Sequence, residues 1–149
     1  MAYEEDEEEV EEKRAVNCKV ILIGGSGVGK SSIICRYISN TFSSVYMATP
    51  GANFTTKTVF FQDENQSIKF EIWDTAGNEK YRYLTKAFYK NAAVYILVYD
   101  ITRRVSFEEL KNYWIPSIKA HIKPSCSKFV FILKIFFYIF IFSFGTCWK

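Results

Sequence analysis

Short apolar runs alternate along this chain with segments in which apolar residues recur at helical spacing. Runs of four to eight apolar or β-branched residues predict strands, and recurrence every three to four residues predicts helices. Strands alternating with helices favour a parallel α/β sheet with right-handed crossovers. The pattern predicts strands at 20–23, 54–61, 67–73, 92–99 and 129–133, and helices at 30–39, 80–89 and from Ser106 towards Ile118.

Two local signals refine this arrangement. Residues 54–61 and 67–73 are separated by the polar turn Asp63-Glu64-Asn65, so we expect an antiparallel hairpin between them. The Ser106-x-x-Glu109 spacing predicts a capping box that begins a helix at Ser106, and Pro116 predicts a distortion within that helix.

Charge divides the chain more sharply than hydrophobicity does. Residues 1–14 hold eight acids and two bases, so we expect a disordered acidic arm. The remaining residues carry seventeen bases against eight acids, a formal charge of +9, which favours an anionic ligand or surface. The four cysteines form no C-x-x-C pair and there is one histidine, which argues against a zinc site.

Residues 24–31 match the pattern G-x-x-x-x-G-K-S/T, between a predicted buried strand and a predicted helix. Glycines in such a turn allow backbone N–H groups to point inward, and these groups together with the helix N-terminus bind phosphates. Lys30 is predicted to reach the β- and γ-phosphates, Ser31 to bind Mg²⁺ and Ser32 to reach the α-phosphate. The backbone of this loop contributes Gly25, Ser26, Gly27, Val28 and Gly29 to the predicted nucleotide site.

A second motif, Asp74-x-x-Gly77, follows the predicted strand at 67–73. An Asp at a strand end is where phosphate-loop proteins hold the Mg²⁺ shell. Gly77 carries no side chain that would block its N–H from a γ-phosphate. We therefore predict Asp74 as a metal ligand and Gly77 as a phosphate contact.

These motifs, with W-D-T-A-G at 73–77 and Y-I-L-V-Y-D-I-T at 95–102, resemble the Ras superfamily of small GTPases. Trp73, the Lys80-Tyr81-Arg82 run and the S-F-E-E-L segment at 106–110 resemble its Rab branch, and the match spans 17 to about 133. The resemblance implies a three-layer P-loop NTPase G domain, mostly parallel with one antiparallel strand. It also implies a GTP-binding switch that hydrolyses GTP to GDP and recruits effectors in vesicle traffic, at the cytoplasmic face of intracellular membranes or in the cytosol.

Further roles follow from this resemblance alone. Thr49 matches the switch I threonine that binds Mg²⁺, although Pro50 stands where the family usually has an aliphatic residue. Phe42 matches the aromatic residue that packs against guanine. Phe54, Trp73 and Phe88 match the aromatic triad that meets effectors, and ordinary core packing is the alternative for them. Implied partners are GTP or GDP, effectors, exchange factors and GTPase-activating proteins, with no nucleic acid.

The position where the family has its water-orienting glutamine holds Asn78. Its amide sits about 1–1.5 Å further back, and a misplacement of about 1 Å can cost on the order of 10²-fold. We expect slow hydrolysis, with Asn78 and Lys30 as the catalytic residues. The alternative is that a partner protein supplies the catalysis and Asn78 matters little.

The family's N-K-x-D and S-A-K motifs, which contact guanine, do not follow the predicted strand at 129–133. Residues 134–149 are instead rich in Phe and Ile, and Cys147 fits no prenylation pattern. We therefore divide the chain into the arm at 1–14, a C-terminally incomplete G domain at 15–133 and an aberrant tail at 134–149. Translated AT-rich intron and a membrane anchor at 129–144 are both open interpretations of the tail. A non-functional fragment or pseudoGTPase, or another phosphate-loop NTPase, also stays open for the chain.

Overall fold

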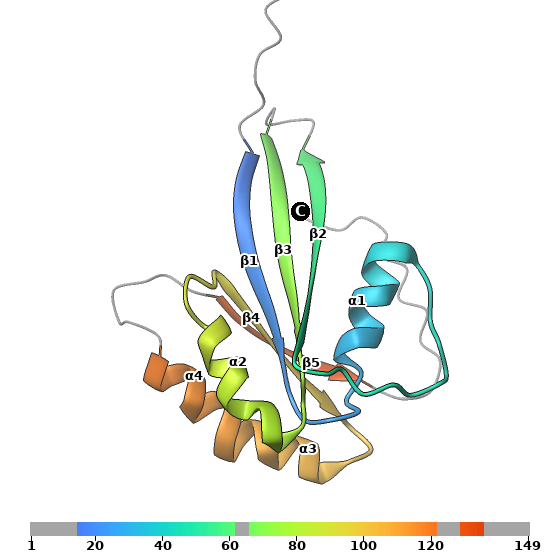
Figure 1. The fold of residues 1–149 in the computed structure, drawn as a ribbon, viewed down its shortest axis with the longest axis vertical. Coiled ribbons are helices and arrows are strands. Elements are labelled where there is room, and N and C mark those ends of the chain that lie inside the picture. The colour runs from blue at the N-terminus through green and yellow to red at the C-terminus, as the bar shows by residue number, and fades with distance from the viewer. Residues whose placement is uncertain (1–14, 62–65, 122–128, 136–149) are drawn as a thin grey trace, which may run out of the picture.

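The computed structural model describes residues 15–61, 66–121 and 129–135, in which one twisted sheet is flanked by helices (Figure 1). The predicted turn at 63–65, the acidic arm and residues 136–149 lie outside the described residues. The strands are β1 (Ala15–Ile23), β2 (Ala52–Phe61), β3 (Gln66–Thr75), β4 (Val94–Asp100) and β5 (Phe129–Ile135). The helical elements are α1 (Lys30–Ser39), the 3₁₀ turn η2 (Glu79–Tyr81), α2 (Arg82–Phe88), α3 (Arg104–Glu109), the π-helical turn η3 (Leu110–Trp114) and α4 (Ile115–His121).

The strand order is β2-β3-β1-β4-β5. Only β2 and β3 pair antiparallel, and β1 pairs parallel with both β3 and β4. The predicted hairpin and the mostly parallel α/β sheet are therefore confirmed. Because β1, β3 and β4 run in the same direction, their carboxyl ends meet at one edge of the sheet, where ligands bind in open α/β folds.

Two apolar clusters cover opposite faces of the sheet and give the expected three layers. Alternate residues of β1 point to each face, as strand geometry requires. Ile21 and Ile23 pack with Trp114 and Ile118 from η3 and α4, whereas Val20 and Leu22 pack towards Ile34 of α1. Figure 1 shows α1 on one side of the sheet and α2, α3 and α4 on the other.

The helix predicted to start at Ser106 begins earlier, at Arg104, so the capping-box prediction was wrong. The Ser106 hydroxyl is fully buried, donates to the Arg103 carbonyl at 2.7 Å and accepts from the Asp100 backbone N–H at 3.0 Å. Ser106 thus ties the end of β4 to the helix, while Glu109 pairs with Arg82 instead of closing a cap.

The distortion predicted at Pro116 is confirmed, because the preceding turn is π-helical and the Ile115 N–H donates to the Leu110 carbonyl.

The strand β5 shows where the sheet ends relative to the predicted tail. It pairs parallel with β4 along its whole length and ends at Ile135, two residues past the expected domain end at 133. Residues 129–135 therefore belong to the sheet. No helix within residues 15–61, 66–121 and 129–135 is long and apolar enough to cross a membrane.

Candidate nucleotide-binding site

The phosphate loop (residues 24–31) joins the carboxyl end of β1 to the start of α1. Gly29, the residue before α1, has a φ of +92°, and Gly27 has a φ of +70°, conformations that glycine adopts without strain. A Cβ placed on Gly24 would overlap the Val98 carbonyl oxygen of β4. The loop is therefore packed directly on the sheet, and Val28 at its centre is fully buried.

Lys30 is the most unusual residue of this loop, because its side chain is only 6% exposed. Its ammonium donates to the carbonyl oxygens of Gly24 at 3.0 Å and Gly25 at 2.8 Å. Burial lowers the pKa of Lys30 to about 8, although the charges of Asp74 and Glu109 oppose that shift. A buried cation whose hydrogen bonds among the described residues go to two carbonyl oxygens favours an anionic ligand, which a phosphate would supply.

Ser31, Thr49 and Asp74 come from three separate segments and meet at one point. The Ser31 hydroxyl donates to Asp74 Oδ2 at 2.6 Å and lies 2.9 Å from the Thr49 hydroxyl. The Thr49 hydroxyl lies 3.4 Å from the same carboxylate oxygen. Thr49 reaches this point even though Pro50 follows it. The structure thus brings together all three residues predicted to bind a metal.

Asp74 also has a second carboxylate oxygen that is available to a ligand. Its Oδ1 is buried and has no hydrogen-bond partner among the described residues. Burial raises the pKa of this carboxyl, against the hydrogen bonds from Ser31 and Thr49 and the charge of Lys30. A buried carboxylate oxygen beside two hydroxyls fits a hard divalent cation such as Mg²⁺, which prefers oxygen ligands. Within the described part of the chain no three His, Cys, Asp or Glu side chains cluster to hold a metal, so such an ion would depend on these hydroxyls and on phosphate.

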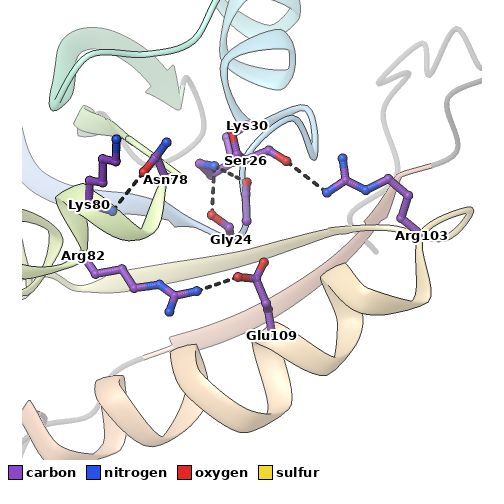
Figure 2. A network of polar contacts seen from close by, with 9 residues as sticks. Gly24, Ser26, Lys30, Asn78, Lys80, Arg82, Arg103 and Glu109 are labelled. Carbon is purple, nitrogen blue, oxygen red and sulfur yellow. Dashed lines mark hydrogen bonds and ion pairs between the residues drawn. The ribbon is translucent and has the colours of Figure 1, made fainter.

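Gly77 and Asn78 follow Asp74 at the loop leading into η2. A Cβ on Gly77 would overlap the Gly25 carbonyl and the Ser26 nitrogen, so Gly77 lies against the phosphate loop as expected. The Asn78 side chain caps η2, because its Oδ1 accepts from the Lys80 backbone N–H at 2.9 Å. In this conformation the amide oxygen expected to orient water is engaged by the protein itself, as Figure 2 shows.

The segment at 40–51, which we call switch I, is far more exposed than the phosphate loop. Phe42 is 55% exposed, and Ser32 on α1 is half-buried. Their predicted contacts with guanine and the α-phosphate stay predictions. Tyr46 is 64% exposed, and its hydroxyl lies 2.9 Å from the Ser26 hydroxyl.

The aromatic triad forms a continuous stack across the β2–β3–α2 surface. The rings of Phe54 and Trp73 are 5.0 Å apart, and those of Trp73 and Phe88 are 4.8 Å apart. Phe54 is 52% exposed, whereas Trp73 and Phe88 are half-buried and also pack on the apolar core. Core packing and surface exposure thus coexist in the triad. A hollow of about 630 Å³ lies beside it, lined in part by Lys19 and Lys90.

Sequence reasoning missed three residues that contact this site. Arg103 donates to the Ser26 carbonyl at 3.1 Å, and Tyr46 meets the Ser26 hydroxyl. Glu109 lies beside Gly25. It also pairs with Arg82, as Figure 2 shows. These pairs join residues 20 to 84 positions apart, and no local motif marks them.

Comparison with known proteins agrees with this geometry. The family model described as "Ras family" matches residues 19–135. The "Ras-related protein Rab-1" of Theileria annulata is 41% identical over 117 residues, which cover 78% of this chain and 52% of that protein. "Ras-related protein Rab-22A" of Mus musculus is 47% identical over 107 residues, covering 72% and 54%, and "Ras-related protein RabC" of Dictyostelium discoideum is 44% identical over 103 residues, covering 69% and 52%.

The chain therefore belongs to the Ras family of small GTPases, and it is a Rab-like member of that superfamily. It spans about half the length of the curated relatives that it matches.

Proposed function

We propose that this chain is a guanine-nucleotide switch of the Rab type, which binds GTP or GDP with Mg²⁺, hydrolyses GTP slowly and recruits effectors in vesicle traffic. The convergence of Ser31, Thr49 and Asp74 on one point carries this proposal, because each lies on a different segment of the chain. A hydroxyl from switch I within reach of the metal ligands makes switch I sensitive to what occupies the site.

Different groups of the protein are proposed to bind the phosphates, the metal ion and the base. Inward-facing amides of residues 25–29 bind the phosphate oxygens, and the Lys30 ammonium exchanges its two carbonyl partners for phosphate oxygens. Ser31, Asp74 and Thr49 would hold Mg²⁺, with Thr49 contributed by the exposed switch I segment. When bound, the ion neutralises charge on the β- and γ-phosphates. Ser32 and Phe42 complete the site towards the α-phosphate and the base.

Hydrolysis is proposed to be slow for a structural reason. Asn is a favoured capping residue because its short side chain folds back onto the following backbone. Asn78 does this with the Lys80 N–H, so its amide must leave the cap before it can orient water over the γ-phosphate. Lys30 and Asn78 remain the proposed catalytic residues, and a GTPase-activating protein is the partner that would compensate.

The triad of Phe54, Trp73 and Phe88 is the proposed effector surface, because its three rings stack together and remain partly exposed. In sequence, Phe54 follows switch I (40–51) and Phe88 ends the helix that follows Asn78. Partly exposed aromatic residues between two switching segments are typical of interface hot spots. Exchange factors are further proposed partners, and nucleic acid is not. Function at the cytoplasmic face of intracellular membranes or in the cytosol is proposed from the family. We propose residues 1–14 as an appended arm and a G domain that runs from 15 to 135, where β5 ends, rather than to 133, with 136–149 as a separate tail.

Nucleotide retained by the purified full chain tests this function. We expect denaturation to release close to one guanine nucleotide per chain, identified by base and phosphate count, and EDTA to accelerate its loss. Ser31→Ala should abolish retention, whereas Ser39→Ala, an exposed serine on the same helix, should not. An empty protein supports the alternative of a non-functional fragment or pseudoGTPase, and adenine in place of guanine would overturn the assignment to a GTPase.

A further inference from the structure

Glu109 on α3 lies between the phosphate loop and α2. One carboxylate oxygen, Oε1, accepts from Arg82 Nη2 at 2.5 Å, and Arg82 is the first residue of α2. A Cβ placed on Gly25 would overlap the other oxygen, Oε2, so this oxygen lies directly against the phosphate loop. A single carboxylate therefore pairs with Arg82 of α2 (Figure 2) and also lies against the phosphate loop.

Arg82 is held in place from its other side. Its guanidinium lies 4.1 Å from the ring centre of Tyr113 and 5.6 Å from that of Trp114, which is fully buried. The side chains of Arg82 and Glu109 are only 26% and 31% exposed. Shielding and aromatic stacking give such a pair a more definite geometry than a solvated surface pair has.

The charge of Glu109 reaches the site itself. It is one of the two negative charges that act on the buried ammonium of Lys30. An unpaired carboxylate at this place would repel the phosphates that the loop binds, because like charges in a partly buried site are weakly screened. Arg82 neutralises this carboxylate only while α2 stays in the position described here.

We propose that Glu109 is a positioning residue that couples α2 to nucleotide affinity: Arg82 masks its charge when α2 is docked, and displacement of α2 exposes that charge to the phosphates and promotes release. This inference rests on the proposed function, since it needs phosphates in the site. It assigns to the Arg82–Glu109 pair a regulatory role, and the partner that would exploit it is one that pulls α2 away from α3.

The experiment is a double-mutant cycle on the full chain, with the nucleotide dissociation rate as the readout. Arg82→Gln unmasks the carboxylate, and we expect release about 10-fold faster, which corresponds to about 1.4 kcal/mol. In the Glu109→Gln background the same Arg82→Gln change should alter the rate less than twofold, since no charge is left to unmask. Arg82→Lys, which keeps the charge, should retain slow release.

The chain offers a matched control one residue away. Arg104 and Glu108 form an exposed pair at 3.3 Å on the same helix, with Arg104 90% exposed. The cycle built from Arg104→Gln and Glu108→Gln should show no coupling. Equal effects of Arg82→Gln with and without Glu109 would overturn the proposal, because independent residues give additive effects. A merely structural contact would make Glu109→Gln alone speed release as much as Arg82→Gln does, whereas the proposal expects Glu109→Gln alone not to speed it. Equal coupling in the control pair would also overturn the proposal.

Amide hydrogen exchange in nucleotide-free protein separates this proposal from the proposed function. Glu109→Gln should speed exchange in 79–88, because α2 loses its anchor, and Glu108→Gln should not. If the chain binds no nucleotide but Glu109→Gln still speeds exchange in 79–88, the proposed switch function is refuted and the contact between Glu109 and α2 is supported. If exchange in 79–88 is unchanged in Glu109→Gln, the proposed coupling between Glu109 and α2 is refuted even if the chain binds nucleotide.

Discussion

The phosphate loop and switch I contribute to the same candidate site, yet only the phosphate loop is packed into the sheet. Val28 and Lys30 are buried, and Gly24 rests against β4. In switch I, Val45, Tyr46 and Met47 are 64–82% exposed. The hydroxyls of Thr49 and Tyr46 join this exposed segment to the loop and to Asp74.

This difference suits the two tasks of a switch. A packed loop keeps its amides oriented before ligand arrives, so little ordering entropy is lost on binding. A segment attached through a few hydroxyls has low local stability and can change conformation at small cost. Substitutions in the first region should therefore change affinity greatly, and substitutions in the second should change conformational response more than affinity.

The largest effect is expected for Lys30→Met, which keeps an unbranched side chain but removes the buried charge. Loss of charge-assisted bonds to two phosphates costs about 4 kcal/mol, or about 10³-fold in affinity. Equilibrium dialysis or titration calorimetry with GDP would measure this. Lys111→Met, on the exposed side of η3, is the control, and a loss of less than tenfold for Lys30→Met would place the phosphates elsewhere.

Asn78→Gln tests a residue that belongs to neither the phosphate loop nor switch I and is expected to affect catalysis rather than affinity. A glutamine amide reaches further and is a poorer cap, so we expect single-turnover GTP hydrolysis to become faster by up to about 10²-fold. Affinity for GDP should stay unchanged. Equal hydrolysis rates for the two proteins would show that the length of this side chain does not limit catalysis.

Asp74→Asn should separate metal binding from folding. Without the carboxylate, Mg²⁺ should strengthen nucleotide binding about 30-fold less than it does in the unmodified chain, a loss of about 2 kcal/mol. In EDTA and without nucleotide the variant should be at least as stable, because burial raises the pKa of Asp74 and a neutral amide avoids that cost. Titration calorimetry with GDP in Mg²⁺ and in EDTA measures the first effect, and thermal unfolding in EDTA without nucleotide measures the second. A lower Tm in EDTA would contradict this account.

The smallest effect is expected in the exposed region. Tyr46→Phe removes one hydroxyl that contacts Ser26 at an exposed site, worth about 0.5 kcal/mol or about twofold in GTP affinity. Exchange of amides 40–51 should nevertheless increase clearly, since Tyr46 ties this segment to the loop. A tenfold loss of affinity would mean that switch I is as tightly built as the phosphate loop.

The fold was largely predictable because hydrophobic periodicity is local. The helix at 30–39 has the predicted bounds, and the hairpin strands and β4 lie within a few residues of expectation, whereas β1 begins at Ala15, five residues before the predicted start at 20. The start at Ser106 failed because a tertiary contact with Asp100 claimed the hydroxyl that a capping box would use. Local signals describe what a residue could do, and packing decides which partner it takes.

The site shows the same division. Ser31, Thr49 and Asp74 lie in recognisable motifs, so their convergence could be expected from sequence. The contacts of Glu109 and Arg103 could not, because they depend on how α3 is set against the loop. The capping role of Asn78 was also missed, although Asn is a favoured capping residue and the 3₁₀ turn that follows is short.

The packing of Gly24 against Val98 has a consequence for synthesis on the ribosome. Central strand β1 has both of its neighbours later in the chain, and Val98 is made seventy-four residues after Gly24. At ordinary translation rates that interval lasts about 4–15 s. During this interval the phosphate loop lacks the β4 strand against which it packs. Nucleotide therefore cannot assist the first steps of folding, and it binds only after β4 has paired with β1.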